Sequence, residues 1–176
     1  MDGSGLEEGI GAAAVIYRKG SNIPLNHLKA YLGPSTKHNS YKGEAVGGLL
    51  VCWLIRNTIG TDFKMVSIYI DNQALIKIMV APKVLSGQYL VQAFADMADN
   101  LTAKITVQWI SSHSDVKGNE QADKLAKEAA KGKASRCMDL PPILHIKLPN
   151  STSATKEHHL EQLKSRWKLT WLDSPR

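Results

Sequence analysis

The hydrophobic pattern of this chain switches repeatedly between the two-residue period of a strand and the longer period of a helix, which restricts it to folds that mix both elements. Apolar residues alternate from Val66 to Ile70, and the alternation stops at Asp71, after which a helical pattern begins. The same reasoning predicts strands over 10–17, 27–32 and 105–110 and helices over 41–56, 86–100 and 119–131. We therefore expect an α/β protein whose sheet is partly antiparallel.

The helix expected over 119–131 has the clearest pattern in the chain. Asn119 is a plausible N-cap, and Gly132 follows the last residue of the pattern, where helices commonly end. Four apolar residues lie at helical spacing on one face: Ala122, Leu125, Ala126 and Ala129. This face should pack against the rest of the domain.

Size and charge favour a folded protein with an anionic partner. The 176 residues are 43% hydrophobic, which is enough for a buried core. There are 22 Lys and Arg against 16 Asp and Glu, a net charge of +6 and an isoelectric point near 9.3. This balance favours nucleic acid as a partner, although many basic proteins bind no polymer.

The cysteines and the apolar runs predict a soluble, intracellular protein. Cys52 and Cys137 have neither the spacing of metal ligands nor that of a disulfide framework. The longest apolar run, over 49–55, is too short to span a bilayer, and the N-terminus lacks a signal-peptide pattern. Whether the compartment is the nucleus or the cytoplasm stays open.

A change in composition after Gly132 divides the chain into three parts. Residues 1–133 are expected to form the globular domain. Residues 134–154 contain Pro141, Pro142 and Pro149 and are expected to form a linker. Residues 155–176 are expected to form a basic, amphipathic helical tail, which docks on the domain or on another partner.

Four acidic residues stand where the chain changes direction or enters a helix, so that their side chains can converge. They are Asp2, Glu44, Asp71 and Asp123. Carboxylate oxygens are hard ligands suited to Mg²⁺ or Mn²⁺. Two such ions about 4 Å apart would activate a water and neutralise the leaving oxygen in phosphodiester hydrolysis. Without a cation, carboxylates so close together would repel and take up protons.

Each carboxylate also has a structural explanation. Asp71 could be the N-cap of the helix that follows it, and Asp123 could form an ion pair with Lys127 one turn later. Asp2 could belong to a loose, glycine-flanked terminus. Considered alone, Asp123 is better explained by the ion pair than by a place in a metal site. For Asp71 alone, the helix cap and a place in a metal site explain the residue equally well.

Glu44 is a stronger candidate because of its neighbours. An acidic residue in the first turn of a helix could simply interact with the helix dipole. Gly47 and Gly48, however, lie three and four residues later and leave that face of the helix bare. A bare face allows another backbone to approach closely and leaves Glu44 room to point into a site.

His113 follows the strand over 105–110 in a small polar loop, ten residues before Asp123. A loop histidine is more often an ordinary surface residue than a catalyst. The loop could nevertheless hold His113 at the edge of a site bounded by the helix over 119–131. There an imidazole titrating near neutral pH could carry protons or help the product leave.

Several motifs occur in a consistent order over residues 1 to about 133. They are Asp2-Gly3-Ser4-Gly5 before an apolar strand, Glu44 in a helix, Ile68-Tyr69-Ile70-Asp71-Asn72-Gln73, Trp109-Ile110-Ser111-Ser112-His113 and Gly118-Asn119-Glu120-Gln121-Ala122-Asp123. Together they resemble the ribonuclease H family, and the last motif is the most specific. Within the family the chain is similar to the ribonuclease H domain of non-LTR retrotransposon polyproteins, where a linker and a basic tail with tryptophans commonly follow.

The resemblance implies a five-stranded mixed sheet flanked by helices and an endonuclease that cuts the RNA strand of RNA–DNA hybrids. It implies that two Mg²⁺ or Mn²⁺ ions are held by Asp2, Glu44, Asp71 and Asp123, assisted by His113. Gly3, Ser4 and Asn72 would lie near the scissile strand and Asn119 near the minor groove, where RNA is distinguished by its 2′-hydroxyls. A reverse transcriptase domain in the intact gene product is a possible partner.

Two other functions stay open. Only Met1 precedes Asp2, so the first strand is expected to be short, and the chain could be a catalytically silent remnant that binds nucleic acid. An integrase-like polynucleotidyl transferase would use similar carboxylates on a similar sheet. The run from Gly118 to Asp123 argues against the second alternative.

Overall fold

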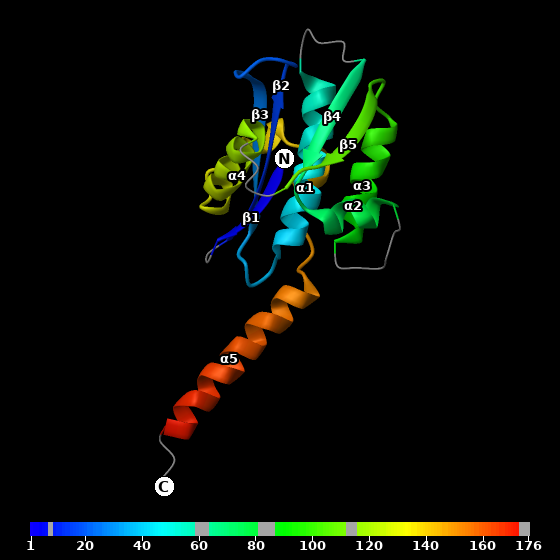
Figure 1. The fold of residues 1–176 in the computed structure, drawn as a ribbon. Coiled ribbons are helices and arrows are strands. Elements are labelled where there is room, and N and C mark those ends of the chain that lie inside the picture. Colours follow the sequence, from blue (N-terminus) through cyan, green and yellow to red (C-terminus); the bar gives the residue numbers. More distant parts are fainter. Residues whose placement is uncertain (7–8, 59–63, 81–86, 112–115, 173–176) are drawn as a thin grey trace.

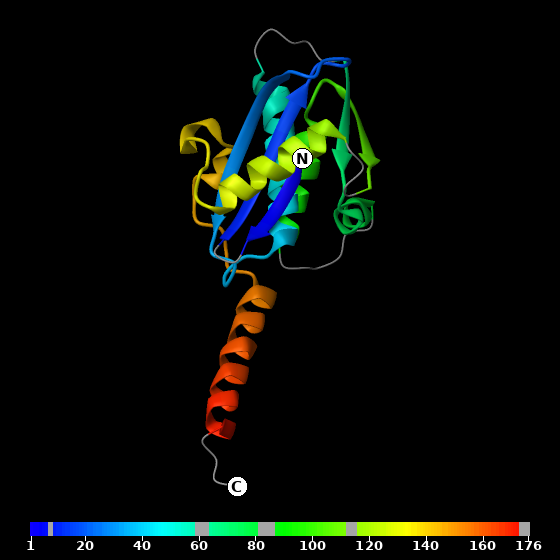
Figure 2. The same ribbon diagram turned by 60° about the vertical axis from the view of Figure 1, so that its left-hand side comes forward.

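The computed structural model describes residues 1–6, 9–58, 64–80, 87–111 and 116–172, and within them it confirms a mixed α/β fold (Figures 1 and 2). The strands are β1 (Asp2–Leu6), β2 (Gly9–Tyr17), β3 (Pro24–Gly33), β4 (Met65–Ile70) and β5 (Lys104–Trp109). The helices are α1 (Ser40–Asn57), α2 (Gln73–Val80), α3 (Gln88–Asp99), α4 (Lys117–Ala130) and α5 (Thr152–Leu172), with short 3-10 turns at Cys137–Asp139 and Pro142–Leu144.

The strands form two sheets. Strands β1, β2 and β3 are antiparallel in that order, whereas β4 and β5 form a separate parallel pair. The two sheets approach each other at the first residue, where the Met1 nitrogen donates a hydrogen bond to the Tyr69 carbonyl at 3.3 Å. The single five-stranded sheet that the resemblance implies stays a prediction.

Helix α1 forms the centre of the core. It packs on β1 and β2 on one side and on α3 on the other, while α4 covers the opposite face of β1 and β2 (Figure 2). Val46, Leu49 and Leu50 of α1 are fully buried, together with Ile70 of β4 and Phe94 of α3. Helix α1 is buried on several faces, as its apolar pattern predicts.

Two boundaries differ from the sequence prediction. Helix α4 begins at Lys117 with Val116 as its N-cap, so Asn119 lies inside the helix and its predicted capping role is wrong. Strand β1 was not predicted from residue pattern, because Asp2-Gly3-Ser4-Gly5 has no apolar alternation. It forms by pairing with β2, from Asp2 opposite Ala13 to Leu6 opposite Gly9.

The segment expected to be a linker packs against the domain. The Trp53 indole N–H of α1 donates to the Asp139 carbonyl at 2.9 Å, and Leu140 and Leu148 are buried. The Lys42 ammonium donates to the Pro149 carbonyl. Residues 137–151 therefore form a strap along α1, although the domain boundary at residue 133 stays a prediction.

Helix α5 extends away from the domain beyond this strap (Figure 1). Its apolar side chains are exposed, among them Leu160, Leu163 and Trp167. Among the described residues, no helix combines the length and the apolar character that a bilayer crossing demands. Cys52 is buried, Cys137 is exposed, and both are free cysteines.

Gly11 of β2 lies directly against α4, and a side chain there has no space. A Cβ at Gly11 would overlap the Ala126 carbonyl oxygen and the Ala130 nitrogen, which are rigid backbone atoms. We expect Gly11→Ala to destabilise the chain by about 3 kcal/mol, because the helix must move off the sheet. Urea unfolding measures this loss. The matched control is Gly20→Ser, where a Cβ meets nothing within 4 Å and the strain arises only from a φ of 81°; an equal loss in both variants would contradict the packing argument.

Candidate metal centre

Three of the four predicted carboxylates meet at one point of the fold. Asp2 comes from the start of β1, Glu44 from α1, and Asp71 directly follows the end of β4. Each offers a carboxylate oxygen, and these oxygens all lie within 4.8 Å of one another. Asp2 and Glu44 are 7% and 6% exposed, so two of the three groups are buried. We call Asp2, Glu44 and Asp71 the acidic cluster.

Glycines bring the elements of the acidic cluster together. A Cβ on Gly3 would overlap the backbone of Gly43 and Glu44, so β1 and α1 approach more closely than side chains would allow. A Cβ on Gly47 would lie 2.8 Å from the Met1 sulfur and 3.3 Å from the Asp2 carbonyl oxygen. A Cβ on Gly48 would instead meet the Phe94 ring, so the predicted approach of another backbone is confirmed at Gly47 and not at Gly48.

Burial makes the charges of the acidic cluster unfavourable. Desolvation, followed by the charges of Asp2 and Asp71, raises the pKa of Glu44 to about 8. The backbone N–H of Gly3 and the terminal amine act in the opposite direction. Desolvation, followed by the charges of Asp71 and Asp123, raises the pKa of Asp2 to about 6. Glu44 is therefore largely protonated at neutral pH when no cation is near.

One oxygen of the acidic cluster is left without a hydrogen bond. The Glu44 Oε2 atom is buried and has no donor among the described protein atoms. A buried carboxylate oxygen normally has a partner, and a divalent cation supplies one while neutralising the repulsion between the acids. The donor set, three carboxylate groups, is the type that Mg²⁺ and Mn²⁺ prefer.

Asp71 is not the helix cap that it could have been. The Asn72 side chain accepts a hydrogen bond from the Leu75 N–H at 3.2 Å and thereby caps α2. The carboxylate of Asp71 lies instead in the acidic cluster, where it accepts a hydrogen bond of 3.4 Å from the Asn119 side chain. Asn119 thus holds Asp71 from α4 rather than capping that helix.

Asp123 lies beside the acidic cluster and also forms its predicted ion pair. Its carboxylate makes a hydrogen bond with Asp2 and raises the pKa of Asp2. The Lys127 ammonium, one helical turn later, donates a hydrogen bond of 2.6 Å to Asp123 Oδ2. The side chains of this pair are 40% and 51% exposed, so the ion pair contributes little stability. Asp123 can turn toward a cation bound at Asp2 without a large loss.

The remaining predicted residues have different outcomes. His113 lies outside the described residues, so its role stays a prediction. Gly3 and Ser4 are in β1, and Ser4 is buried. One group near the acidic cluster was not predicted, the amine of Met1, which is buried and interacts with all three acids. Only its position next to Asp2 could have indicated it.

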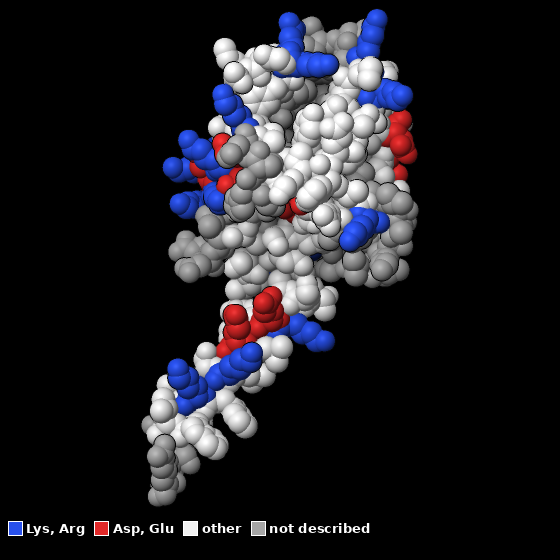
Figure 3. Space-filling view, viewed as in Figure 1, with Lys and Arg blue, Asp and Glu red and all other residues white. Residues whose placement is uncertain are grey.

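Positive charge surrounds the opposite end of β4. Exposed Lys and Arg side chains lie where β2 ends and where β4 and β5 begin (Figure 3). They are Arg18, Lys19, Lys64 and Lys104. Since β4 has six residues, this basic end lies about 20 Å from the acidic cluster.

Comparison with known proteins gives no family assignment. No family model matches this chain, and no curated protein matches its sequence.

Proposed function

We propose that this chain is a metal-dependent endonuclease with a ribonuclease H-like fold that hydrolyses the RNA strand of RNA–DNA hybrids. The observation that carries the proposal is the acidic cluster, in which Asp2, Glu44 and Asp71 from three separate elements place carboxylate oxygens within 4.8 Å. The buried Glu44 Oε2 atom also supports the proposal, because it has no hydrogen-bond partner among the described atoms and a bound cation would supply one. The motifs from Asp2 to Asp123 connect this site to the ribonuclease H family.

Asp2, Glu44 and Asp71 would hold one Mg²⁺ ion, and Asp123, beside Asp2, would help to hold a second. When bound, the two ions supply an activated water and neutralise the charge that develops on the leaving oxygen. Asn119 keeps Asp71 in position through its hydrogen bond. Lys127 pairs with Asp123, and its ammonium would have to give way to a cation. His113 would move a proton at the leaving group.

Nucleic acid would contact the surface between the acidic cluster and the basic end of β4. Lys and Arg contacts to phosphates supply affinity without sequence preference, and this affinity weakens as salt increases. Selection for RNA requires contact with 2′-hydroxyls in the wide minor groove of the hybrid. Asn72 and the backbone around Gly3 and Ser4 are proposed to lie near the scissile strand, and Asn119 near the minor groove.

The direct test is cleavage of a hybrid with one labelled RNA strand. With Mg²⁺ we expect endonucleolytic products from the RNA strand, and none with a chelator or with duplex DNA of the same sequence. Raising salt from about 50 to 200 mM should lower the apparent affinity by at least about tenfold if several phosphates are contacted. Cleavage of duplex DNA in preference to the hybrid would favour the polynucleotidyl transferase alternative.

A second candidate is a hybrid-binding protein without activity. It is favoured by the ion pair between Lys127 and Asp123, because the ammonium occupies a carboxylate that a second cation would need. In that case the chain would bind the hybrid at low salt, and the RNA strand would stay intact at every Mg²⁺ and Mn²⁺ concentration. A binding assay run beside the cleavage assay separates the two functions.

A further inference from the structure

Helix α5 carries an exposed apolar stripe. The stripe consists of Leu160, Leu163, Trp167 and Trp171, which follow one another at intervals of three or four residues. This spacing puts them on one face of the helix over three turns, a length of about 16 Å. Trp167 and Trp171 are 75% and 76% exposed, and both leucines are exposed as well. We call these four residues the α5 stripe.

The domain holds the start of α5 and directs the rest of the helix away. The Ser151 backbone N–H donates to the Lys37 carbonyl at 2.6 Å, and the Asn39 side chain donates to the Ser153 hydroxyl at 3.1 Å. Ala154 is buried, but the helix beyond it extends outward in both views (Figures 1 and 2). A helix of 21 residues is marginally stable alone in water, because most helical stability comes from packing of an apolar face. A partner on the α5 stripe would supply that packing.

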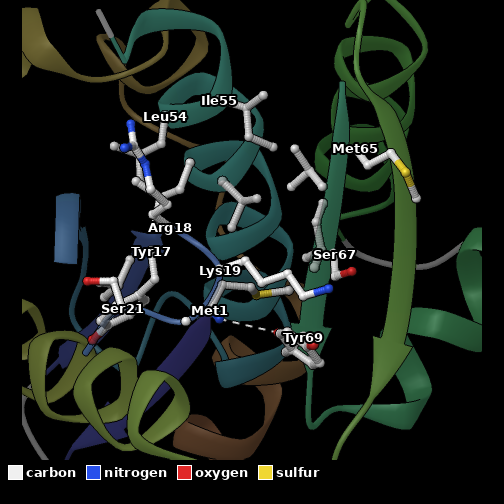
Figure 4. Close-up of a pocket in the computed structure, with 16 residues that line it drawn as sticks. Met1, Tyr17, Arg18, Lys19, Ser21, Leu54, Ile55, Met65, Ser67 and Tyr69 are labelled. Atoms are coloured by element: carbon white, nitrogen blue, oxygen red, sulfur yellow. Dashed lines mark hydrogen bonds between the residues drawn. The ribbon is translucent and has the colours of Figure 1, made fainter. Parts of the chain in front are cut away.

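The groove of the domain does not receive the α5 stripe. This groove, of about 880 Å³, lies between β2 and β4, and its floor is the part of α1 that contains Leu54 and Ile55 (Figure 4). The start of α5 contacts Asn39 at the opposite end of α1, about 20 Å away. Among the described residues, those that line the groove all lie outside α5. The α5 stripe is therefore open to a second molecule.

Charged side chains beside the α5 stripe form two halves of opposite sign. Glu157 and Glu161 follow one edge of the stripe in the first half of the helix, and in Figure 3 the acidic side chains of α5 lie nearer the domain. Lys164 and Lys168 follow the same edge in the second half. All four are exposed, and within the described part of the chain none belongs to an ion pair. The edge is therefore complementary to a copy of itself that runs in the opposite direction.

We propose that the α5 stripe binds the α5 stripe of a second copy of this chain, with the two helices antiparallel. Two-fold symmetry brings the same edge of both helices together, so each acidic half lies beside a basic half. In a parallel pair this edge would face the other edge of the second helix, which carries His159 and Arg166 and offers no carboxylate. This inference concerns self-association and does not rest on the proposed nuclease activity.

One register satisfies both the apolar and the charged residues. When Leu160 of one copy lies opposite Trp167 of the second, their stripes overlap along the helices. Glu161 is then displaced by about 3 Å along the axis from both Lys164 and Lys168 of the second copy, which is within reach of their side chains. Each of these contacts is made twice, because the pair is symmetric.

The α5 stripe is large enough for a weak, reversible dimer. Two tryptophans and two leucines remove on the order of 500 Å² of surface per copy from water. The total is at the low end for specific interfaces, so we expect a dissociation constant on the order of 10 µM. At or below about 1 µM, where unfolding is measured, the chain is then largely monomeric. Substitutions in α5 should leave the stability of the domain unchanged there.

The test is sedimentation of the full chain between about 1 and about 200 µM. We expect the mass to rise from 19.3 kDa toward twice that value. Leu163→Gln together with Trp167→Gln should weaken dimerisation at least about tenfold, because it removes the centre of the stripe. The matched control is Leu169→Gln together with Leu172→Gln, since both leucines are exposed on other faces of α5. The control should dimerise as the native chain does. A native chain that stays monomeric throughout, or equal dimerisation of the two variants, would overturn the proposal.

Charge reversal tests the antiparallel direction. Glu157→Lys with Glu161→Lys should weaken the dimer at least about tenfold at low salt, and so should Lys164→Glu with Lys168→Glu, because either change places like charges together. All four substitutions in one chain restore opposite charges and should bring the dissociation constant back to within about threefold. Failure of the fourfold variant to recover would overturn the antiparallel pair.

Binding of an RNA–DNA hybrid, measured on the same variants, identifies the other kind of partner. We expect the stripe variant and its control to bind the hybrid equally. A native chain that stays monomeric, together with a loss of hybrid affinity confined to the stripe variant, would show that the exposed tryptophans contact nucleic acid, which overturns the dimer.

Discussion

Replacing Asp71 with Asn should reduce cleavage of the hybrid by about 10³-fold or more while the chain stays folded. The Asp71 carboxylate lies within 4.8 Å of those of Asp2 and Glu44, so the substitution removes one of three negative charges from the acidic cluster. Losing one charged ligand weakens the hold on a divalent ion that must stabilise a developing negative charge. The measurement is the initial cleavage rate with saturating hybrid and Mg²⁺.

The fold should tolerate Asp71→Asn because the new side chain has nearly the same shape. Its carbonyl oxygen can still accept the hydrogen bond from Asn119, and the Trp109 indole donates to the backbone carbonyl of residue 71, which does not change. Asp99→Asn is the matched control, since Asp99 is exposed at the end of α3 and lies outside the acidic cluster. It should cleave at the normal rate. An Asp71→Asn chain that is as active as the control would show that the acidic cluster takes no part in the reaction.

The sequence predicts those helices and strands whose own residues show the hydrophobic period of the element. The alternation from Val66 to Ile70 and the helical spacing around Leu49 are local patterns, and β4 and α1 form where these patterns lie. Strand β1 has no such pattern, since Gly3 and Gly5 alternate with Asp2 and Ser4. Its conformation depends on pairing with β2 and on the close approach of α1, which are long-range contacts that a local pattern cannot reveal.

The sequence predicts the part of the candidate site whose residues lie where the chain changes direction. Asp2 begins β1 and Asp71 directly follows β4, and elements of one domain often meet at such ends. Glu44 lies past the first turn of α1, one residue further into the helix than the sequence pattern indicates. For Asp123 the sequence offers two roles, and the structure contains both, a contact with Asp2 and an ion pair with Lys127. The N-cap role of Asn119 failed because α4 begins two residues earlier, so its side chain is available to Asp71.

Replacing Glu44 with Gln should have opposite effects on activity and on stability. Cleavage should fall by about 10²-fold or more, because Gln is neutral and binds a divalent ion weakly. Without metal, however, the variant should be more stable than the native chain at pH 8. The Glu44 side chain is 6% exposed and its Oε2 atom has no hydrogen-bond donor among the described atoms, so removing its charge removes an unfavourable burial.

The direction in which stability changes with pH follows from the raised pKa of Glu44. The pKa of Glu44 is about 8 in the folded chain against an ordinary value of 4.5, so the folded chain binds this proton more tightly than the unfolded chain does. The contribution of Glu44 to stability is therefore fully present below about pH 4.5 and is lost as pH rises from there through 8. The whole loss is on the order of 5 kcal/mol. The Gln variant has no proton to lose and keeps this stability.

Urea unfolding of both chains between pH 5 and 9, with a chelator present, measures the difference. The pKa of Asp2 is also raised, to about 6, and Asp2 titrates in both chains. Subtracting one stability curve from the other therefore leaves the contribution of Glu44. Glu161→Gln on exposed α5 is the matched control and should follow the native curve. Curves for Glu44→Gln and the native chain that stay parallel from pH 5 to 9 would contradict the burial argument.

Adding Mg²⁺ at pH 8 completes the prediction. A cation that binds only the folded chain stabilises it by about 2.7 kcal/mol when its concentration is about 100 times its dissociation constant. The native chain should gain this stability, because the ion neutralises Asp2, Glu44 and Asp71 together. The Glu44→Gln chain should gain much less, so Mg²⁺ should shrink the stability difference that the two chains have without it. Equal gains in both chains would mean that the ion binds without Glu44, and the acidic cluster would then not be the metal centre.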